Sequence, residues 1–303
     1  MSSTSPPIME HLKAAVEYIL TPSRPVIIVG LLIVFIVPAL VHLFISRQTP
    51  YTSLPFILLA GPAGGGKTSL LTLLERGDAA AETHTSQAPH AVELTVSADA
   101  GASTFREAAR EDAPGSHRKF HLVDTPGHGK LRGAAMAQLG GDGKSGQTQF
   151  GDLAMLRGVI YMLDAATLDD SLADAATYLY HVLLALQKRA GSGRTSRAPN
   201  AVHVLVAANK LDLFTALPAS LVRTNLESEL GRIRQSRSKG LLDSGVGTDE
   251  IGSEEQDSWL GEYGSEKFTF AQMREFDIEV EVIGGSVLEA DVDKWWGWIS
   301  GHV

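Results

Sequence analysis

Three features of the sequence predict an α/β fold with a six-stranded, mostly parallel sheet and helices on both faces. Apolar strand-like runs alternate with helix-like stretches over residues 55–303. A glycine-rich turn joins the first run to the first helix, and a long apolar segment precedes the whole region. We expect strands over 56–60, 92–98, 120–123, 158–163, 202–207 and 278–283, and helices over 68–76, 130–138, 172–189, 219–233 and 292–299.

The first element is a predicted transmembrane helix over residues 26–45. This run is apolar apart from His42, and Arg24 and Arg47 flank it. A helix of this length spans about 30 Å, the thickness of a bilayer's hydrocarbon core. A cleaved signal peptide fits less well, because the preceding segment is long and no small-residue cleavage site lies before Arg47. A buried core helix would rarely be apolar all round. We therefore expect a short N-terminal segment (1–25), a membrane helix (26–45), a linker (46–54) and one domain (55–303).

The composition narrows the class of protein. The chain has no cysteine, which excludes disulfides and thiolate metal sites. A formal net charge of −9 gives no support for sequence-specific nucleic-acid binding. Three polar or glycine-rich stretches interrupt the α/β pattern, and we expect flexible insertions there, at 100–116, 140–150 and 236–267. The last is acidic toward its end and is either a solvated loop or a partner-binding arm.

The turn after the first strand predicts a phosphate-binding loop. It fits G-x-x-x-x-G-K-[ST], and it lies between a strand and a helix as the mechanism requires. In such a turn the backbone N–H groups and the helix dipole converge on a phosphate. We expect the loop to consist of Gly61, Pro62, Ala63, Gly64, Gly65, Gly66, Lys67, Thr68 and Ser69. Lys67 would reach the β- and γ-phosphates, and the Thr68 hydroxyl would complete a Mg²⁺ site.

A second motif, D-x-x-G, ends the strand at 120–123. Asp124 would hold Mg²⁺, and the Gly127 amide would contact the γ-phosphate. Loss of that phosphate would free the following segment and so make a nucleotide-gated switch. His128 stands where small GTPases often carry a water-orienting glutamine, so it either orients the attacking water or faces away and packs. We assign His128 and Lys67 as the candidate catalytic residues.

A first switch needs a threonine over Mg²⁺. Thr83, Thr85 and Ser86 all lie in range after the phosphate loop, and Thr85 has the best spacing. Thr85 is therefore our third expected metal ligand, beside Thr68 and Asp124.

The base is predicted to be guanine. N-K-x-D follows the strand at 202–207, and its aspartate can accept two hydrogen bonds from guanine that adenine cannot donate. A glycine turn after the last strand offers backbone amides. We expect the base to be held by Asn209, Lys210, Asp212, Ser286 and Val287. The expected cofactors are GTP or GDP with Mg²⁺, and because GTP is cytosolic the domain faces the cytosol.

Several segments together resemble the beta subunits of the signal recognition particle receptor, a family of membrane-anchored Ras-like GTPases related to the Arf and Sar group. These are the single apolar span, residues 83–86 in the first switch, residues 124–132 in the second, and Phe268-Thr269-Phe270 before the last strand and a Trp-rich terminal helix. The loop Gly284-Gly285-Ser286-Val287 departs from the usual Cys-Ser-Ala-Lys. The H-x-K-L-R run after D-x-P-G is the most discriminating piece.

The resemblance implies a single-pass protein of the endoplasmic reticulum membrane, with residues 1–25 in the lumen. It further implies that the GTP-bound form grips the N-terminal domain of the receptor's alpha subunit, in an assembly that docks ribosomes at the translocon during co-translational targeting. Two alternatives stay open from sequence alone. One is an anchored Arf- or Sar-like trafficking GTPase with other effectors, and the other is a constitutively GTP-bound scaffold without a hydrolysis cycle.

Overall fold

The computed structural model describes residues 24–48, 54–77, 82–97, 117–140, 147–148, 151–152, 155–191, 201–243, 259–261 and 267–303. The chain separates into two compact units, residues 1–52 and 53–303. The predicted insertion at 100–116 lies outside the described residues, as do most of residues 1–25 and of the insertion at 140–150.

The first unit contains helix α2, Arg24–Gln48, which includes the segment predicted to span a membrane. Large apolar side chains between Ile27 and Val41 are exposed on this helix. In the part of the chain that the structure describes, no helix reaches the combined length and apolarity that a membrane crossing requires.

The second unit is built on one six-stranded sheet, which confirms the predicted α/β fold. The strand order is β2-β3-β1-β6-β7-β8, and only β2 runs antiparallel to its neighbour. The strands are β1 (Phe56–Ala60), β2 (His90–Ser97), β3 (His117–Asp124), β6 (Leu156–Asp164), β7 (Val202–Asn209) and β8 (Ile278–Gly284). A separate two-residue pair, β4 (Gln147–Thr148) and β5 (Gly151–Asp152), lies outside this sheet.

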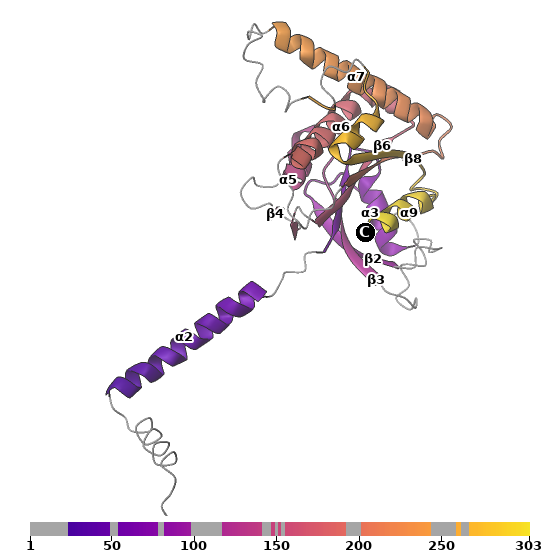
Figure 1. Cartoon of the computed structure of the whole chain (residues 1–303). Coiled ribbons are helices and arrows are strands. Elements are labelled where there is room, and N and C mark those ends of the chain that lie inside the picture. Colours follow the sequence, from indigo (N-terminus) through magenta and orange to yellow (C-terminus); the bar gives the residue numbers. More distant parts are fainter. Residues whose placement is uncertain are drawn as a thin grey trace, which may run out of the picture. The chain divides into compact units, whose positions relative to one another are not determined.

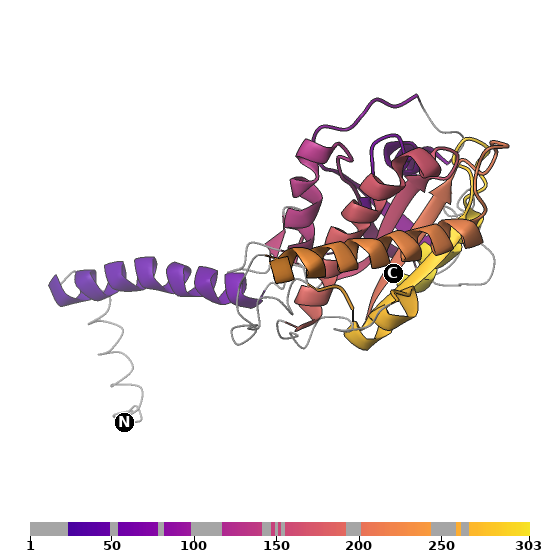
Figure 2. The same cartoon turned by 90° about the horizontal axis from the view of Figure 1, so that it is seen from above.

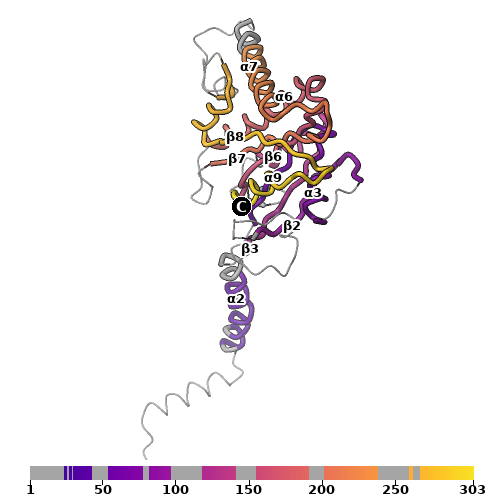
Figure 3. Tube along the Cα trace, turned by 90° about the vertical axis from the view of Figure 1, so that its right-hand side faces the viewer, coloured from indigo at the N-terminus to yellow at the C-terminus, as the bar shows by residue number. Residues whose placement is uncertain are grey.

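Helices cover both faces of the sheet (Figure 1). One core cluster joins the sheet to α5 (Gly133–Gly140), α6 (Leu168–Gly191), α7 (Ala219–Asp243) and the 3₁₀ helix η3 (Phe270–Phe276). The other joins the opposite face to α3 (Lys67–Arg76) and α9 (Asp293–His302). Figure 3 shows α6 and α7 on one side of β6–β8 and α9 on the other. β1 is buried on both faces, as expected of a central parallel strand.

Local sequence explains where α6 begins and ends. Asp169 and Asp170 lie in the first turn of α6, and Lys188 and Arg189 lie in its last turn. This charge order complements the helix dipole. On the opposite face, Gly158 gives the Trp-rich α9 room to approach, because a Cβ there would lie 2.8 Å from the Trp298 ring.

Two elements differ from the sequence expectation. Helix α7 continues to Asp243, so the first eight residues of the insertion predicted at 236–267 belong to it. The helix predicted over 130–138 is split into a 3₁₀ turn, η1 (Gly129–Leu131), and α5. Figure 2 shows the length of α7, drawn in orange.

Part of the predicted insertion is attached to the domain. The Gln187 side chain of α6 donates a hydrogen bond to the Trp259 carbonyl at 2.9 Å and accepts one from the Gly261 N–H at 2.9 Å. The Arg234 guanidinium of α7 lies 4.7 Å from the centroid of the Trp259 ring. Residues 259–261 are therefore held against α6 and α7.

Candidate nucleotide-binding site

The phosphate loop joins β1 to α3 at the carboxyl edge of the parallel strands. Gly66 is the residue before α3 and has φ 97°, in the left-handed region. A Cβ at Gly66 would lie 2.2 Å from Asn209 Nδ2, and one at Gly61 would lie 2.0 Å from the Met162 carbonyl oxygen. Both positions therefore require glycine, because the loop is packed directly against its neighbours.

Lys67 is the buried cation of this loop. Its side chain is 5% exposed, and Nζ donates hydrogen bonds of 2.8 Å to the carbonyls of both Gly61 and Pro62. Burial lowers the Lys67 pKa to about 8, against the opposing effect of the negative charge of Asp124. Burial removes water that would otherwise stabilise the Lys67 charge. An anionic ligand bound at the glycine-rich loop would stabilise that charge in place of the water.

Thr68 and Asp124 meet beside Lys67. The Thr68 hydroxyl donates a 2.7 Å hydrogen bond to Asp124 Oδ2. Asp124 is 1% exposed, and its Oδ1 has no hydrogen-bond partner among the described residues. Burial is the main cause that raises the Asp124 pKa. An unpartnered buried carboxylate oxygen next to a threonine hydroxyl fits a hard divalent cation such as Mg²⁺.

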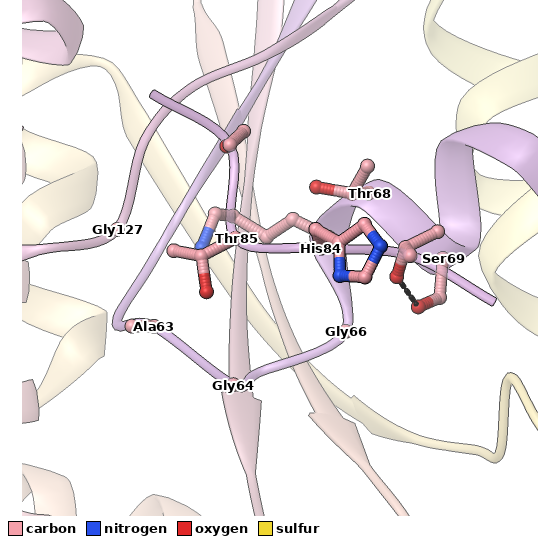
Figure 4. A pocket seen from close by; sticks show the side chains of 11 residues that line it. Ala63, Gly64, Gly66, Thr68, Ser69, His84, Thr85 and Gly127 are labelled. Atoms are coloured by element: carbon pink, nitrogen blue, oxygen red, sulfur yellow. Dashed lines mark hydrogen bonds between the residues drawn. The ribbon is translucent and has the colours of Figure 1, made fainter. Parts of the chain in front are cut away.

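These residues border a pocket of about 240 Å³. Figure 4 shows the loop curving through Ala63, Gly64 and Gly66 toward Thr68 and Ser69. The first predicted switch forms part of the same wall, and the Ser69 and Thr83 hydroxyls are hydrogen-bonded at 2.9 Å. The lining residues are Ala63, Gly64, Gly66, Lys67, Thr68, Ser69, Thr83, His84, Thr85, Ser86 and Gly127.

The pocket lining does not single out one residue of the first switch. Thr83, Thr85 and Ser86 all contribute to it, so the assignment of Thr85 to Mg²⁺ stays a prediction. Ser86 also helps to hold the Asp124 pKa down against burial, an effect that the spacing argument did not anticipate.

The two neighbouring residues of the second switch, Gly127 and His128, differ in exposure. Gly127 lines the pocket, and a Cβ there would lie 2.6 Å from each of Lys67 Nζ, Ala63 N and the Gly61 carbonyl oxygen. His128, the next residue, is exposed and is not among the pocket-lining residues. The structure brings Gly127 to the predicted site, and the catalytic role of His128 stays a prediction.

Asn209 links the phosphate loop to the predicted base loop. It is 3% exposed; its Nδ2 donates to the Gly65 carbonyl at 2.9 Å, and its Oδ1 accepts from the Val287 N–H at 3.0 Å. One amide side chain therefore sets the position of two loops that are far apart in the sequence. The motif indicated Asn209 as a site residue but not this bridging contact.

Asp212 faces the glycine turn after β8. The Ser286 hydroxyl donates a 2.5 Å hydrogen bond to Asp212 Oδ1. Lys210 has φ 67°, and its Nζ donates a 2.6 Å hydrogen bond to Asp164 Oδ2 at the end of β6. Sequence reasoning missed Asp164, although an acidic residue that ends a buried parallel strand would have been a usable signal. All five predicted base-site residues lie at this carboxyl edge.

The pKa of Lys67 gives a pH-dependent prediction. Bound phosphates would raise the Lys67 pKa above its value of about 8 in the free protein. Above about pH 8, the Lys67 amine must therefore take up a proton when the nucleotide binds. We expect the affinity for a GTP analogue to be constant below about pH 8 and to fall at higher pH, by up to about tenfold per pH unit. Titration across this range checks it. An affinity that stays flat to about pH 9 would show that Lys67 is not desolvated in the free protein.

Comparisons by sequence and by structure found similar proteins. Residues 52–276 match the family model of the signal recognition particle receptor beta subunit. The chain is 30% identical over 247 residues to signal recognition particle receptor subunit beta of Saccharomyces cerevisiae, covering 81% of this chain and 83% of the yeast protein.

Two solved structures from Chaetomium thermophilum are similar as well. The signal recognition particle receptor SRb-GTP/SRX complex is 42% identical, covers 82% of this chain and 100% of the solved chain, and has a TM-score of 0.66. The SRb-GDP-Mg structure is also 42% identical, with 84% and 100% coverage and a TM-score of 0.58.

Proposed function

Since the chain belongs to the signal recognition particle receptor beta subunit family, we propose that it anchors a receptor alpha subunit at the endoplasmic reticulum membrane in a GTP-dependent manner. One observation carries this proposal: the phosphate loop, residues 83–86 and Gly127 line a single pocket. A nucleotide in that pocket contacts both switches, so the surface that they offer to a partner depends on whether a γ-phosphate is present.

The chain is a small GTPase with guanine nucleotide and Mg²⁺ as cofactors. The loop amides and Lys67 would hold the phosphates, and Thr68, Asp124 and Thr85 would hold the metal. When bound, Mg²⁺ neutralises charge on the phosphates. Gly127 would contact the terminal phosphate, and His128 would orient water for hydrolysis.

The base is held at the other end of the site. Asp212 accepts hydrogen bonds from guanine, and Ser286 orients its carboxylate. Asn209 keeps the Val287 amide in place, and the Lys210 stem covers one face of the base. Because the loop Gly284-Gly285-Ser286-Val287 lacks the lysine of the usual Cys-Ser-Ala-Lys, selectivity rests on the Asp212 carboxylate and on backbone amides.

We assign α2 to the membrane, with residues 1–25 in the lumen, 26–45 in the bilayer, 46–54 as a linker and 55–303 in the cytosol. The sequence of residues 26–45 supports this assignment, because the run is apolar apart from His42 and as a helix would reach about 30 Å, the thickness of a bilayer's hydrocarbon core. Its exposed apolar side chains, from Ile27 to Val41, would otherwise face water. Such an anchor brings the alpha subunit, and with it the ribosome and translocon, to the membrane surface.

A charge placed in the middle of α2 tests the membrane assignment. Phe35 is 68% exposed near the centre of the helix, and we expect Phe35→Arg to release a large fraction of the protein from membranes. A central arginine costs about 2.5–3.5 kcal/mol of insertion free energy. Resistance to alkaline extraction is the measurement. His42→Arg, near the helix end, is the matched control and should remain membrane-bound; equal retention of both variants would argue against a span.

Partner binding tests the proposal as a whole. The fragment from Arg47 onward, loaded with a non-hydrolysable GTP analogue, with GDP or with nothing, is offered the N-terminal domain of a receptor alpha subunit. We expect capture only with the GTP analogue. Equal capture in all three states would make the nucleotide structural. No capture despite full guanine nucleotide occupancy would favour an anchored Arf- or Sar-like GTPase with another partner.

A further inference from the structure

Arg132 makes three contacts just after the second switch. Its Nε donates a hydrogen bond to the Gly127 carbonyl oxygen at 3.2 Å. Its two terminal nitrogens donate to the two carboxylate oxygens of Asp174, Nη1 at 2.9 Å to Oδ1 and Nη2 to Oδ2. Its guanidinium carbon lies 4.6 Å from the centroid of the Tyr178 ring. Three of the five N–H groups of this guanidinium and one of its two faces are therefore engaged.

Helix α6 supplies a rigid platform for Arg132. Asp174 and Tyr178 are four residues apart and so lie on one face of the helix. The Tyr178 ring is buried and packs edge-on against Tyr161 of β6, with centroids 5.7 Å apart. Tyr161 in turn donates a 2.7 Å hydrogen bond to the Ala175 carbonyl. The platform is thus fixed to the central sheet.

Gly127, whose carbonyl accepts the hydrogen bond from Arg132, is closely packed, but as a glycine it can adopt many backbone angles. Gly127 lies against the phosphate loop, where a Cβ would approach Lys67 Nζ to 2.6 Å. Without a side chain, glycine has no steric preference of its own for one ψ angle. The hydrogen bond from Arg132 to its carbonyl restricts that angle.

The Arg132 contacts differ from an ordinary surface ion pair. The Arg132 side chain is 18% exposed and that of Asp174 is 62% exposed. The hydrogen bond from Arg132 is the main reason that the Asp174 pKa is lowered. A pair that only stabilised α6 would not need to reach the pocket-lining glycine. The bidentate geometry instead fixes the guanidinium plane, so that Nε points at Gly127.

We propose that Arg132, braced by Asp174 and Tyr178, is a positioning residue that holds Gly127 where its N–H meets a terminal phosphate. This inference rests on the proposed GTPase function. It makes Arg132 a determinant of the discrimination between GTP and GDP rather than of overall nucleotide affinity. GDP does not use the Gly127 contact, so its affinity depends on the phosphate loop and base loop alone.

The test measures two dissociation constants for each variant of the full chain in detergent, with fluorescent GDP and a fluorescent non-hydrolysable GTP analogue. In Arg132→Gln we expect the GTP-analogue affinity to fall on the order of tenfold, with GDP affinity nearly unchanged. Arg132→Lys should show the same defect, because it keeps the charge but loses Nε and the planar fork. Asp174→Asn should give a smaller defect of the same kind.

Arg223→Gln is the matched control. Arg223 also pairs with a carboxylate, Glu227 Oε1 at 3.2 Å, and lies 5.9 Å from the centroid of the Phe270 ring, but neither of these partners lines the pocket. Its GTP-to-GDP affinity ratio should equal that of the unmodified chain. Asp174→Asn, at an exposed carboxylate, keeps the test available if Arg132→Gln fails to fold.

Two results would overturn the inference alone. One is an unchanged affinity ratio in the folded Arg132 and Asp174 variants. The other is an equal loss of affinity for both nucleotides, which would make the pair merely structural. If the unmodified chain binds neither nucleotide, the proposed function fails together with the inference.

Discussion

Lys67→Ala is expected to abolish stable binding of GTP. The Lys67 ammonium is buried and held by the Gly61 and Pro62 carbonyls, so it is already in place for a phosphate. Each hydrogen bond to a charged group contributes about 1.5–3 kcal/mol, and losing the two bonds that Lys67 would make to the β- and γ-phosphates weakens binding by roughly 100-fold or more. Titration with a fluorescent GTP analogue measures the loss.

Lys119→Ala is the control for Lys67→Ala. Lys119 is an exposed lysine of β3 that pairs with Glu93 Oε1 at 2.7 Å and does not line the pocket. Its removal should leave the GTP affinity unchanged. An unaltered affinity in Lys67→Ala, with the fold intact, would show that the phosphate loop has been misassigned.

Asp212→Asn is expected to shift base preference from guanine toward xanthine nucleotides. The carboxylate accepts from both guanine donors, whereas an amide can donate to the extra carbonyl of xanthine. We expect GTP affinity to fall by about 100-fold or more, and affinity for xanthosine triphosphate to rise. The Ser286 hydroxyl can still donate to the asparagine Oδ1, so the loop should keep its place.

Competition between the two triphosphates measures this shift. Asp291→Asn is the matched control, since Asp291 is an exposed carboxylate that follows the same loop. Its preference should not change. Retained guanine selectivity in Asp212→Asn would place the base pocket elsewhere in the domain.

The fold was predictable because the apolar runs are long and regular. β1, β6 and β7 read as continuous apolar segments and are buried strands, and the glycine-rich turn could only lie between a strand and a helix. The extension of α7 to Asp243 was not predictable. Its polar composition reads as a loop, and the contacts that hold it, such as Arg237 over the Tyr180 ring, are made to distant residues.

The candidate site was predictable as a set of residues but not as a network. Motif spacing identified Asn209, but it could not show that one amide binds both Gly65 and Val287. Lys210 was identified, but its partner Asp164 belongs to another strand. Such contacts depend on the order of strands in the sheet, which a sequence motif does not encode.

The first switch shows a different limit. Thr83, Thr85 and Ser86 are interchangeable by residue type and nearly so by spacing, and all three line the pocket. Choosing among them needs the position of the metal. A local sequence pattern contains no information on that position.

Hydrogen exchange of the full chain tests the central claim most directly. The protection of residues 83–86 and 127–132 is compared between the chain bound to a non-hydrolysable GTP analogue with Mg²⁺ and the chain bound to GDP. We predict that the GTP analogue slows exchange in both segments, because both border the pocket. If each segment is protected to the same extent with the GTP analogue as with GDP, the result would contradict a nucleotide-gated switch.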